Sequence, residues 1–572
     1  MLGRRRYSLV ALVLACGASQ RSDPQSPQPA AVATEPGVDE TTLVGYRRHH
    51  EGPLRVTAEA LDVDRLLDAL HTFALLDVGS PEESLDLRAE LVSVGVPEQM
   101  LALADGGGRW VFASEVPASD EHLRFEVPTT RASAMLDALV ANAGARRDSS
   151  TEVSLGEAEI SMRARSHEDR VVFGFTADAV RAPLPSGLSA GEHLRVVVDD
   201  VAAARQHLLV DAGVDFHSDL HATLHAWLGR VQRAELTASV LETDGVRARA
   251  QVHGALAGLD DGLLGMPLQS PGKLERVLPP RPVTAVVASV GDTGAVRRWL
   301  DGRLSREPIR DPELRPLVEQ LDALLDLVHA RVGFVAYMLD AEEPAIAVAV
   351  EVADGEVALR RLDPLVRLAN EKMRESGAAA TLRYEHRALR RAGLSGHRFT
   401  LELPLPMRQG AVKALLHGKE ARAALFVVDD VIVAVIGAGV DRLVEQVERA
   451  RKGSSLAESF TAIDPYGEVE GGCHLCSISY DREAARFHLA RAQGLDEVRR
   501  RHALRVLTRL PEGAGTIVGR LDAERLVAHV RWSGPLFGTE AASREARDTW
   551  RAFGEALRGE AGLAGRLRSL VQ

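Results

Sequence analysis

Residues 191–208 read GEHLRVVVDDVAAARQHL, and residues 472–489 read GCHLCSISYDREAARFHL. The two stretches align without a gap at an offset of 281, and nine of the eighteen positions are identical. Such identity over a contiguous stretch indicates an internal duplication, and a repeat decides what any motif inside it can mean. Residues 194–198 have the apolar pattern of a strand, so the second stretch is expected to be extended as well.

Weaker similarities follow in the same order along the chain. Residues 56–58 match 283–285 at an offset of 227, and residues 136–140 match 362–366 at an offset of 226. The hairpin pattern of residues 170–180 resembles that of 431–441 at an offset of 261. Because the offset grows along the chain, the second copy contains insertions of about 35 and 20 residues, which are expected in surface loops.

Hairpin patterns followed by helical patterns are typical of antiparallel sheets with helices packed on one side, which is an α+β fold. We therefore expect two duplicated α+β units of antiparallel sheet with packed helices. The expected boundaries are residues 52–258 for copy 1, a Gly- and Pro-rich linker at 259–281, residues 282–534 for copy 2, and a C-terminal helix within 539–572. Residues 424–440 are expected to form a hairpin, because Asp429 and Asp430 interrupt an apolar run.

The N-terminus carries a targeting pattern. Arg4, Arg5 and Arg6 precede a short apolar run that ends in residues 13–17, VLACG. A positive patch followed by 7–15 apolar residues is typical of a secretory signal and is too short to span a membrane. The VLACG sequence resembles the lipobox of bacterial lipoproteins. The resemblance implies that signal peptidase II removes residues 1–15 and that Cys16 then carries a palmitate-bearing lipid.

The same resemblance predicts the location of the protein. Lipoproteins of this kind that have Asp after the cysteine stay at the inner membrane, and Gly17 therefore favours the outer membrane, with the body of the protein at the periplasm. Residues 16–50 are rich in Ser, Gln, Pro and Ala without a periodic apolar face, so we expect a disordered tether behind the lipid. A chain of that length spans on the order of 30 Å.

Composition and charge limit the partners. The chain is 45% hydrophobic, and removal of residues 1–15 takes away three Arg and no acid, which moves the net charge from −12 to about −15. An acidic body argues against nucleic acid and against anionic lipid as partners. The expected partners are the membrane, through the N-terminal lipid, and an envelope protein or small ligand.

Residues 187–191, GLSAG, satisfy the G-x-S-x-G pattern of a nucleophile elbow. That elbow requires a strand before the serine and a helix after it. Here Pro183 and Pro185 precede the motif and a predicted strand follows it, so we expect an ordinary loop.

His217, His221 and His225 recur every fourth residue on a predicted helix, and Asp215 lies just before it. The three His side chains on one helical face, together with Asp215, could bind zinc or nickel. The row also lies next to the helix's apolar stripe, where His side chains commonly occupy the boundary of a core. We expect no metal or other cofactor and keep these four residues as the candidate ligands.

Cys473 and Cys476 form a C-x-x-C motif, which in an exported protein suggests a redox disulfide. They replace Glu192 and Arg195 of the first copy, in a segment that reads as a strand. Residues three apart in a strand are separated by roughly 10 Å, whereas a disulfide needs Cα atoms within about 7 Å. We therefore expect the two thiols not to bridge, and we keep them as redox candidates.

The residues favour a non-catalytic envelope lipoprotein that acts as a scaffold or binds a partner or ligand, for which the space between the two copies is one candidate site. The alternative is an exported redox or metal-dependent enzyme that uses Cys473 and Cys476 or the His217, His221 and His225 row. No phosphate-binding loop, H-E-x-x-H motif or EF-hand pattern is present in the sequence.

Overall fold

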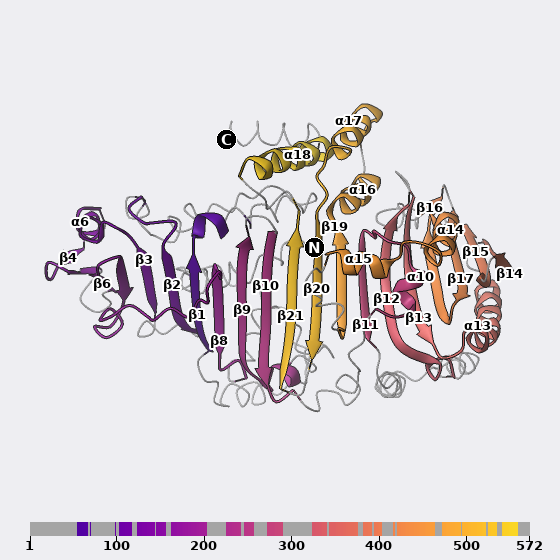
Figure 1. Ribbon diagram of the computed structural model, residues 1–572, viewed down its shortest axis with the longest axis horizontal. Coiled ribbons are helices and arrows are strands. Elements are labelled where there is room, and N and C mark those ends of the chain that lie inside the picture. The colour runs from indigo at the N-terminus through magenta and orange to yellow at the C-terminus, as the bar shows by residue number, and fades with distance from the viewer. Residues whose placement is uncertain are drawn as a thin grey trace, which may run out of the picture. The chain divides into compact units, whose positions relative to one another are not determined.

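The computed structural model of the chain is shown in Figure 1. It describes residues 54–66, 69, 98, 102–116, 123–142, 145–155, 162–202, 225–241, 245–256, 271–289, 323–339, 343–375, 381–391, 394–402, 416–417, 420–463, 472–492, 495–521, 524–534 and 540–558. Unit 1 holds the described residues from 54 to 240 together with Ala250–Leu256, and unit 2 holds Leu241–Arg249 and the described residues from 271 onward. The expected signal peptide, the tether and most of the linker lie outside the described residues.

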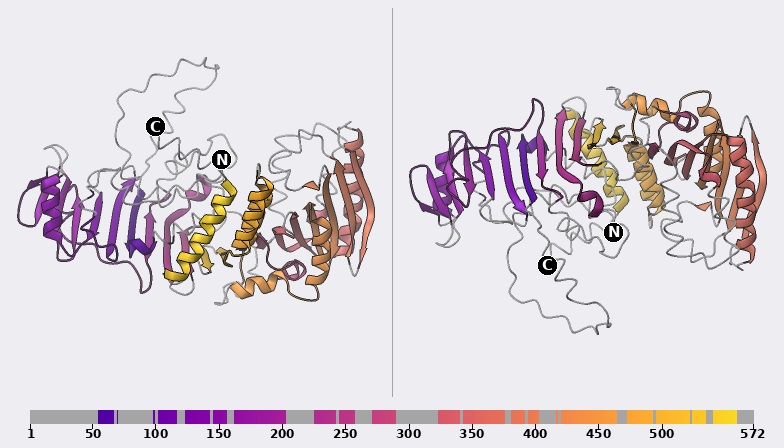
Figure 2. Two further views of the ribbon diagram at one scale, coloured as in Figure 1. Left: turned by 90° about the horizontal axis from the view of Figure 1, so that it is seen from above. Right: turned by 90° about the horizontal axis from the view of Figure 1, so that it is seen from below.

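Unit 1 is built around β1 (Leu54–Leu61), which pairs with β2 (Arg109–Val116) on one side and β8 (Leu194–Asp199) on the other. From β2 the antiparallel ladder continues through β3 (Arg124–Pro128), β7 (Arg170–Gly174), β6 (Met162–Ser166), β5 (Glu152–Leu155) and β4 (Arg146–Arg147). From β8 it continues to β9 (Val231–Leu241), and Ala250–Gly254 of β10 (Gly245–Gly254) also belong to this unit. Helix α6 (Ala132–Asn142) lies against β5, β6 and β7, at one end of this sheet in Figures 1 and 2.

Unit 2 is built around β11 (Thr284–Ser289), which pairs with β12 (Val328–Met338) and β19 (Leu475–Tyr480). From β12 the ladder continues through β13 (Pro344–Val352), β18 (Val431–Gly437), β17 (Glu420–Val428) and β15 (Leu394–Glu402) to β14 (Thr381–Arg391). The short β16 (Leu416–His417) also pairs with β17. From β19 the ladder continues through β20 (Ala514–Leu521) to β21 (Arg525–Ser533).

The helices in the described part of unit 2 are α10 (Lys273–Val277), α13 (Gly355–Glu375), α14 (Val440–Ala450), α15 (Leu456–Ile463), α16 (Asp481–Arg491), α17 (Glu497–Leu507) and α18 (Glu540–Arg558). Helix α18 packs on α17, and its Trp550 and Phe553 are buried. Among the described helices, none combines the length and apolarity needed to cross a membrane.

The prediction of an α+β fold made of two duplicated units with packed helices is wrong. Of the described residues, 44% lie in strands and 30% in helices. The strands are mostly antiparallel and form a large open sheet. The expectation gave too much weight to helical patterns between hairpins. Polar stretches such as β14 have no clear alternation of their own, and pairing with a neighbouring strand makes them extended.

The strands nevertheless follow one another in the same order in each unit. Strands β9, β8, β1, β2, β3 and β7 of unit 1 occupy the places of β20, β19, β11, β12, β13 and β18 of unit 2. Strands β8 and β19, which open the 18-residue repeat, both pair with the central strand. Helix α6 follows β3 in the chain, and helix α13 follows β13. In each unit this strand is the second one from the central strand, β1 or β11.

The register corrects one alignment made from the sequence. Ala60 of β1 pairs with Leu194, and Ala288 of β11 pairs with Leu475. Since Leu194 and Leu475 are equivalent in the repeat, Ala60 corresponds to Ala288, an offset of 228 rather than 227. A one-residue slip matters in a strand, because it would place every side chain on the opposite face of the sheet.

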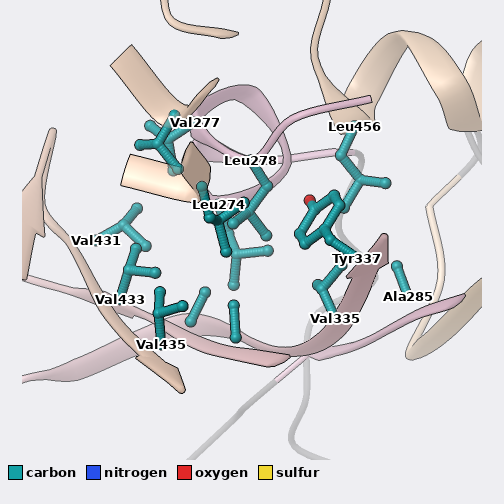
Figure 3. Close-up of a cluster of buried hydrophobic side chains, with 14 of the residues drawn as sticks. Leu274, Val277, Leu278, Ala285, Val335, Tyr337, Val431, Val433, Val435 and Leu456 are labelled. Carbon is teal, nitrogen blue, oxygen red and sulfur yellow. The ribbon is translucent and has the colours of Figure 1, made fainter. Parts of the chain in front are cut away.

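The core of unit 2 lies on one face of its sheet, under α10, α14 and α15 (Figure 3). Val431, Val433 and Val435 point into it from β18, and Tyr337 of β12 donates its hydroxyl to Pro279 O at 2.9 Å. The larger set of buried apolar side chains includes Leu274, Leu278, Ala285, Val335, Phe426, Leu443, Val447, Leu456 and Phe460.

Much of this core comes from a segment that the sequence placed in a surface loop. The insertion of about 20 residues between the hairpin and the repeat contributes α14 and α15, and Leu443, Val447 and Phe460 on these helices are 0%, 0% and 1% exposed. The expectation was wrong because an insertion that carries its own apolar face can pack on a sheet.

Phe460→Ala should lower the free energy of unfolding by about 3–5 kcal/mol, because it opens a cavity in the buried core. Phe334→Ala is the matched control, since Phe334 is 45% exposed and its loss should cost less than about 1 kcal/mol. Chemical denaturation of the two variants measures both values. Equal losses would contradict the assignment of the buried face.

Candidate functional site

The repeated Gly-x-His-Leu sequence forms a bulge at the start of β8 and of β19. Gly191 and Gly472 have φ angles of +83° and +85°, which favour glycine. The backbone N–H of His193 donates to Ala238 O, and that of His474 donates to Gly519 O, beside the pairs made by the next residue. One extra residue is thus accommodated on the bulged strand in each unit.

Both repeated histidines have the same structural role. Nδ1 of His193 accepts a hydrogen bond from Val240 N at 3.3 Å, and Nδ1 of His474 accepts one from Leu521 N at 2.9 Å. Burial is the main cause that lowers the pKa of His193, and the positive charge of Arg65 adds to it. An imidazole nitrogen that accepts a hydrogen bond from a backbone N–H explains why this residue is identical in the two copies.

Cys473 and Cys476 form a disulfide, so the expectation that they cannot bridge is wrong. Their Cα atoms are 6.0 Å apart, against the roughly 10 Å of a continuous strand. β19 begins only at Leu475, and the bulge at His474 turns the chain so that Cys473 lies back over Cys476. The sequence did not reveal this bend, because a single glycine in a sequence does not show that its φ angle is positive.

The disulfide lies in a buried polar cluster of unit 2. Arg331 Nη2 is 3.2 Å from Cys473 Sγ, and Arg331 Nε is 3.0 Å from Glu275 Oε1. Ser289 Oγ donates to Cys473 O at 2.8 Å, and Glu275 Oε2 accepts from Gly272 N at 2.7 Å. Burial raises the pKa of the Glu275 carboxyl, and the adjacent Arg331 opposes that rise.

This cluster contains two features that catalysis could use, a disulfide and a cation beside its sulfur. A guanidinium near sulfur stabilises a thiolate, which makes Arg331 the residue that sequence reasoning missed. However, Cys473 and Cys476 are 0% and 1% exposed, so no thiol of a second molecule reaches either sulfur in this conformation. The geometry therefore fits a structural bridge better than a redox centre.

A second buried acid is Asp481, the first residue of α16. It is 3% exposed, and burial raises its pKa to about 7, while a hydrogen bond donated by Trp532 Nε1 at 3.3 Å opposes the rise. The carboxyl contacts an indole N–H, not a nucleophile or a second carboxyl, so it has the geometry of a buried structural acid. The equivalent Asp200 in the repeat is exposed.

In unit 1, ion pairs line the sheet face opposite α6. The pairs are Glu59 with Arg109 at 2.8 Å, Glu126 with Arg124 at 2.6 Å and with Arg170 at 3.4 Å, and Arg195 with Glu235 at 2.8 Å. Glu126 is fully buried, and three of its neighbouring charges are largely shielded from water. Buried charges of this kind require partners, and the alternating arrangement supplies them.

The chain before the G-x-S-x-G motif crosses this charged face. Leu184 N donates to Glu126 Oε1 at 2.7 Å, and Leu184 O accepts from Arg109 Nη1 at 2.8 Å. Gly187 N donates to both carboxylate oxygens of Glu59, at 3.0 and 3.1 Å. Ser189 follows in an exposed loop with no flanking helix, so the expectation of an ordinary loop is confirmed.

The metal candidates His217, His221 and Asp215 lie outside the described residues, as does the lipidation candidate Cys16. His225 lies in a described helical turn and is half-buried. In the part of the chain that the structure describes, no group of three or more His, Cys, Asp or Glu side chains is arranged to hold a metal ion.

The outer face of the unit 2 sheet is an apolar surface that sequence reasoning missed. Phe334, Val348, Ile436, Leu475 and Ile517 are exposed on it by 45%, 42%, 43%, 42% and 39%. We call these five residues the apolar face. The signal in the sequence is the nearly continuous apolar character of β13 and β18, AIAVAV and VIVAVI, which is typical of strands that are apolar on both sides.

No protein-family model, no curated protein and no solved structure matches this chain. The functional assignment therefore rests on its own residues.

Native protein from an oxidising compartment should resist alkylation at Cys473 and Cys476 until it is both unfolded and reduced. Replacing both by Ala should lower the free energy of unfolding by about 2 kcal/mol, because the bridge closes a very short loop. Mass spectrometry after alkylation, with and without reductant, checks the bridge. Two free thiols in unreduced, unfolded protein would contradict it.

Asp481 should make stability depend on pH. Its folded pKa is about 7, above the value near 3.9 of an unfolded chain, so the folded state retains the proton. The contribution of this group is greatest below pH 4 and is lost as the pH rises to about 7, by at most about 4 kcal/mol. Asp481→Asn should flatten this slope, and Asp200→Asn should leave it unchanged. Unfolding free energies measured from pH 4 to 8 decide, and parallel profiles for wild type and Asp481→Asn would refute the assignment.

Proposed function

We propose that this chain is an exported lipoprotein of the cell envelope, held by lipid on Cys16, which binds a partner or ligand without catalysing a reaction. The observation that supports export beyond the signal pattern is the buried Cys473–Cys476 disulfide. Disulfides persist in the periplasm and outside cells and are rare in reducing compartments. The outer membrane remains the favoured site, from Gly17.

The polar groups favour binding over catalysis, because they are already paired or buried. The charged side chains of the unit 1 face are paired with one another and with residues 182–187. In unit 2 the sulfurs of Cys473 and Cys476 are bonded to each other and buried. The large side chains left exposed together on one sheet face are apolar. An exposed apolar patch marks an interaction surface more often than a reaction centre.

A redox function is the second candidate, and one observation favours it: the guanidinium of Arg331 lies 3.2 Å from Cys473 Sγ. A redox role requires the native disulfide to exchange with a small thiol. Native protein incubated with glutathione should show no mixed disulfide, whereas rapid formation of one would favour the redox function.

Lipidation gives the direct test of the proposed function. Mature wild type should begin at Cys16 and enter the detergent phase, because an acylated terminus adds about 0.8 kcal/mol of membrane affinity for each buried methylene. Cys16→Ser should release the protein into the soluble fraction. Recovery of the wild type as an unacylated soluble protein would refute the proposal. Gly17→Asp is the sorting control and should move the acylated protein to the inner membrane.

A further inference from the structure

The apolar face continues across the unit 2 sheet as a row of cross-strand partners. Phe334 pairs with Val348 on one side and with Val286 on the other. The row extends to Ala434 beyond Val348, and to Ser477, Ile517 and Val530 beyond Val286. Ser477 is the one polar residue among these seven, so a continuous apolar strip crosses seven strands.

Helices border this strip without covering it. Beyond Ala434 the row reaches His397, whose Nε2 is 2.7 Å from Asp363 Oδ1 on α13. Helix α13 is the long salmon helix beside the last strands of the unit 2 sheet in Figure 2. At another border, Phe487 of α16 packs near Ala336 and Met338. The five residues of the apolar face remain 39–45% exposed between these helices.

Sheet surfaces without a covering helix are usually polar, and unit 1 follows that rule with ion pairs on the face opposite α6. In unit 2 both faces are apolar; α10, α14 and α15 cover one of them, and α13 and α16 cover only parts of the other. The backbone groups beneath the apolar face are already paired in the ladders. The surface therefore offers an occupant apolar contact and few hydrogen bonds.

The size and composition of the apolar face indicate a small occupant. Each of the five side chains is about two fifths exposed, and their exposed area is roughly 400 Å² in total. Two copies pressed together would bury on the order of 800 Å², below the roughly 1,200 Å² of a specific protein interface. The face also has no Tyr, Trp or Arg, the residues that anchor protein partners.

From these observations we propose that the apolar face binds an acyl chain of a zwitterionic membrane phospholipid. Seven strands span roughly 29 Å, which is enough for one extended acyl chain to lie across them. The net charge of the mature protein, about −15, disfavours an anionic headgroup, which leaves a zwitterionic one. The proposal deepens the proposed function, since the lipid on Cys16 would hold the face close to a membrane.

The test uses full-length mature protein as wild type and as Cys16→Ser. The probe is phosphatidylethanolamine with a photoreactive diazirine in one acyl chain, supplied in mixed micelles. Labelled peptides are mapped by mass spectrometry, and a fluorescent-acyl phosphatidylethanolamine gives the dissociation constant. Phe334→Ser and Val348→Ser alter the apolar face. Val498→Ser, at a 69% exposed residue of α17, is the matched control.

Labels should map to β12, β13 and β19 in both the acylated and the Cys16→Ser protein. Phe334→Ser with Val348→Ser should raise the dissociation constant about tenfold or more, with an unchanged unfolding midpoint, and Val498→Ser should leave it unchanged. Equal affinity in all variants, or labels elsewhere, would overturn the proposal.

Two other outcomes would also overturn it. Labelling confined to the Cys16→Ser protein would assign the face to the protein's own acyl chain. A dimer in sedimentation that Phe334→Ser dissociates would assign it to a second copy. Failure of lipidation would refute only the proposed function, because the labelling is measured on purified protein.

Discussion

Side chains alternate between the two faces of every strand in this protein, so each sheet has two surfaces that must be satisfied. Unit 1 buries Val127, Phe173 and their neighbours under α6 and fills the opposite surface with paired charges. Unit 2 uses the same strand order but packs α14 and α15 where unit 1 has its charged surface. The outer face of unit 2 stays apolar, and the proposed binding function follows from that imbalance.

The bulges at His193 and at His474 determine where β8 and β19 begin to pair with the central strand of each unit. Gly191 and Gly472 turn the chain, and the imidazole closes the ladder by accepting a neighbouring N–H. Unit 1 then holds its bulged segment with ionic contacts, since Arg195 Nε donates to Glu235 Oε1 at 2.8 Å. At the equivalent place in unit 2 the buried Cys473–Cys476 disulfide replaces these ionic contacts. A buried covalent bond avoids the cost of burying charges, which require partners.

The sequence alone was enough to predict the strands around residue 430 and the loop character of the G-x-S-x-G motif. The hairpin at Asp429 and Asp430 was predicted correctly, and both residues have positive φ. The fold class was not, because strand formation in polar segments depends on partners far away in the chain. The register of β1 was missed by one residue, since a three-residue match cannot fix pairing.

The candidate site was harder to predict for a similar reason. Arg331 and Glu275 are 56 residues apart, and neither lies in a motif, yet they meet beside Cys473. The apolar face was missed because an apolar strand gives the same pattern whether one or both of its faces are covered. Exposure depends on the helices that pack on the sheet, and the strand sequences do not contain that information.

The central claim is that the unit 2 sheet buries one face and exposes an apolar one. Cysteine substituted in turn for Phe334, Val335 and Val348, in a Cys16→Ser background, tests it directly through the rate of thiol labelling in native protein. Phe334→Cys and Val348→Cys should react at close to the rate of the unfolded chain, whereas Val335→Cys, at a site that is 0% exposed, should react only on unfolding. Protection at all three positions would show that the outer face is covered and would contradict the account.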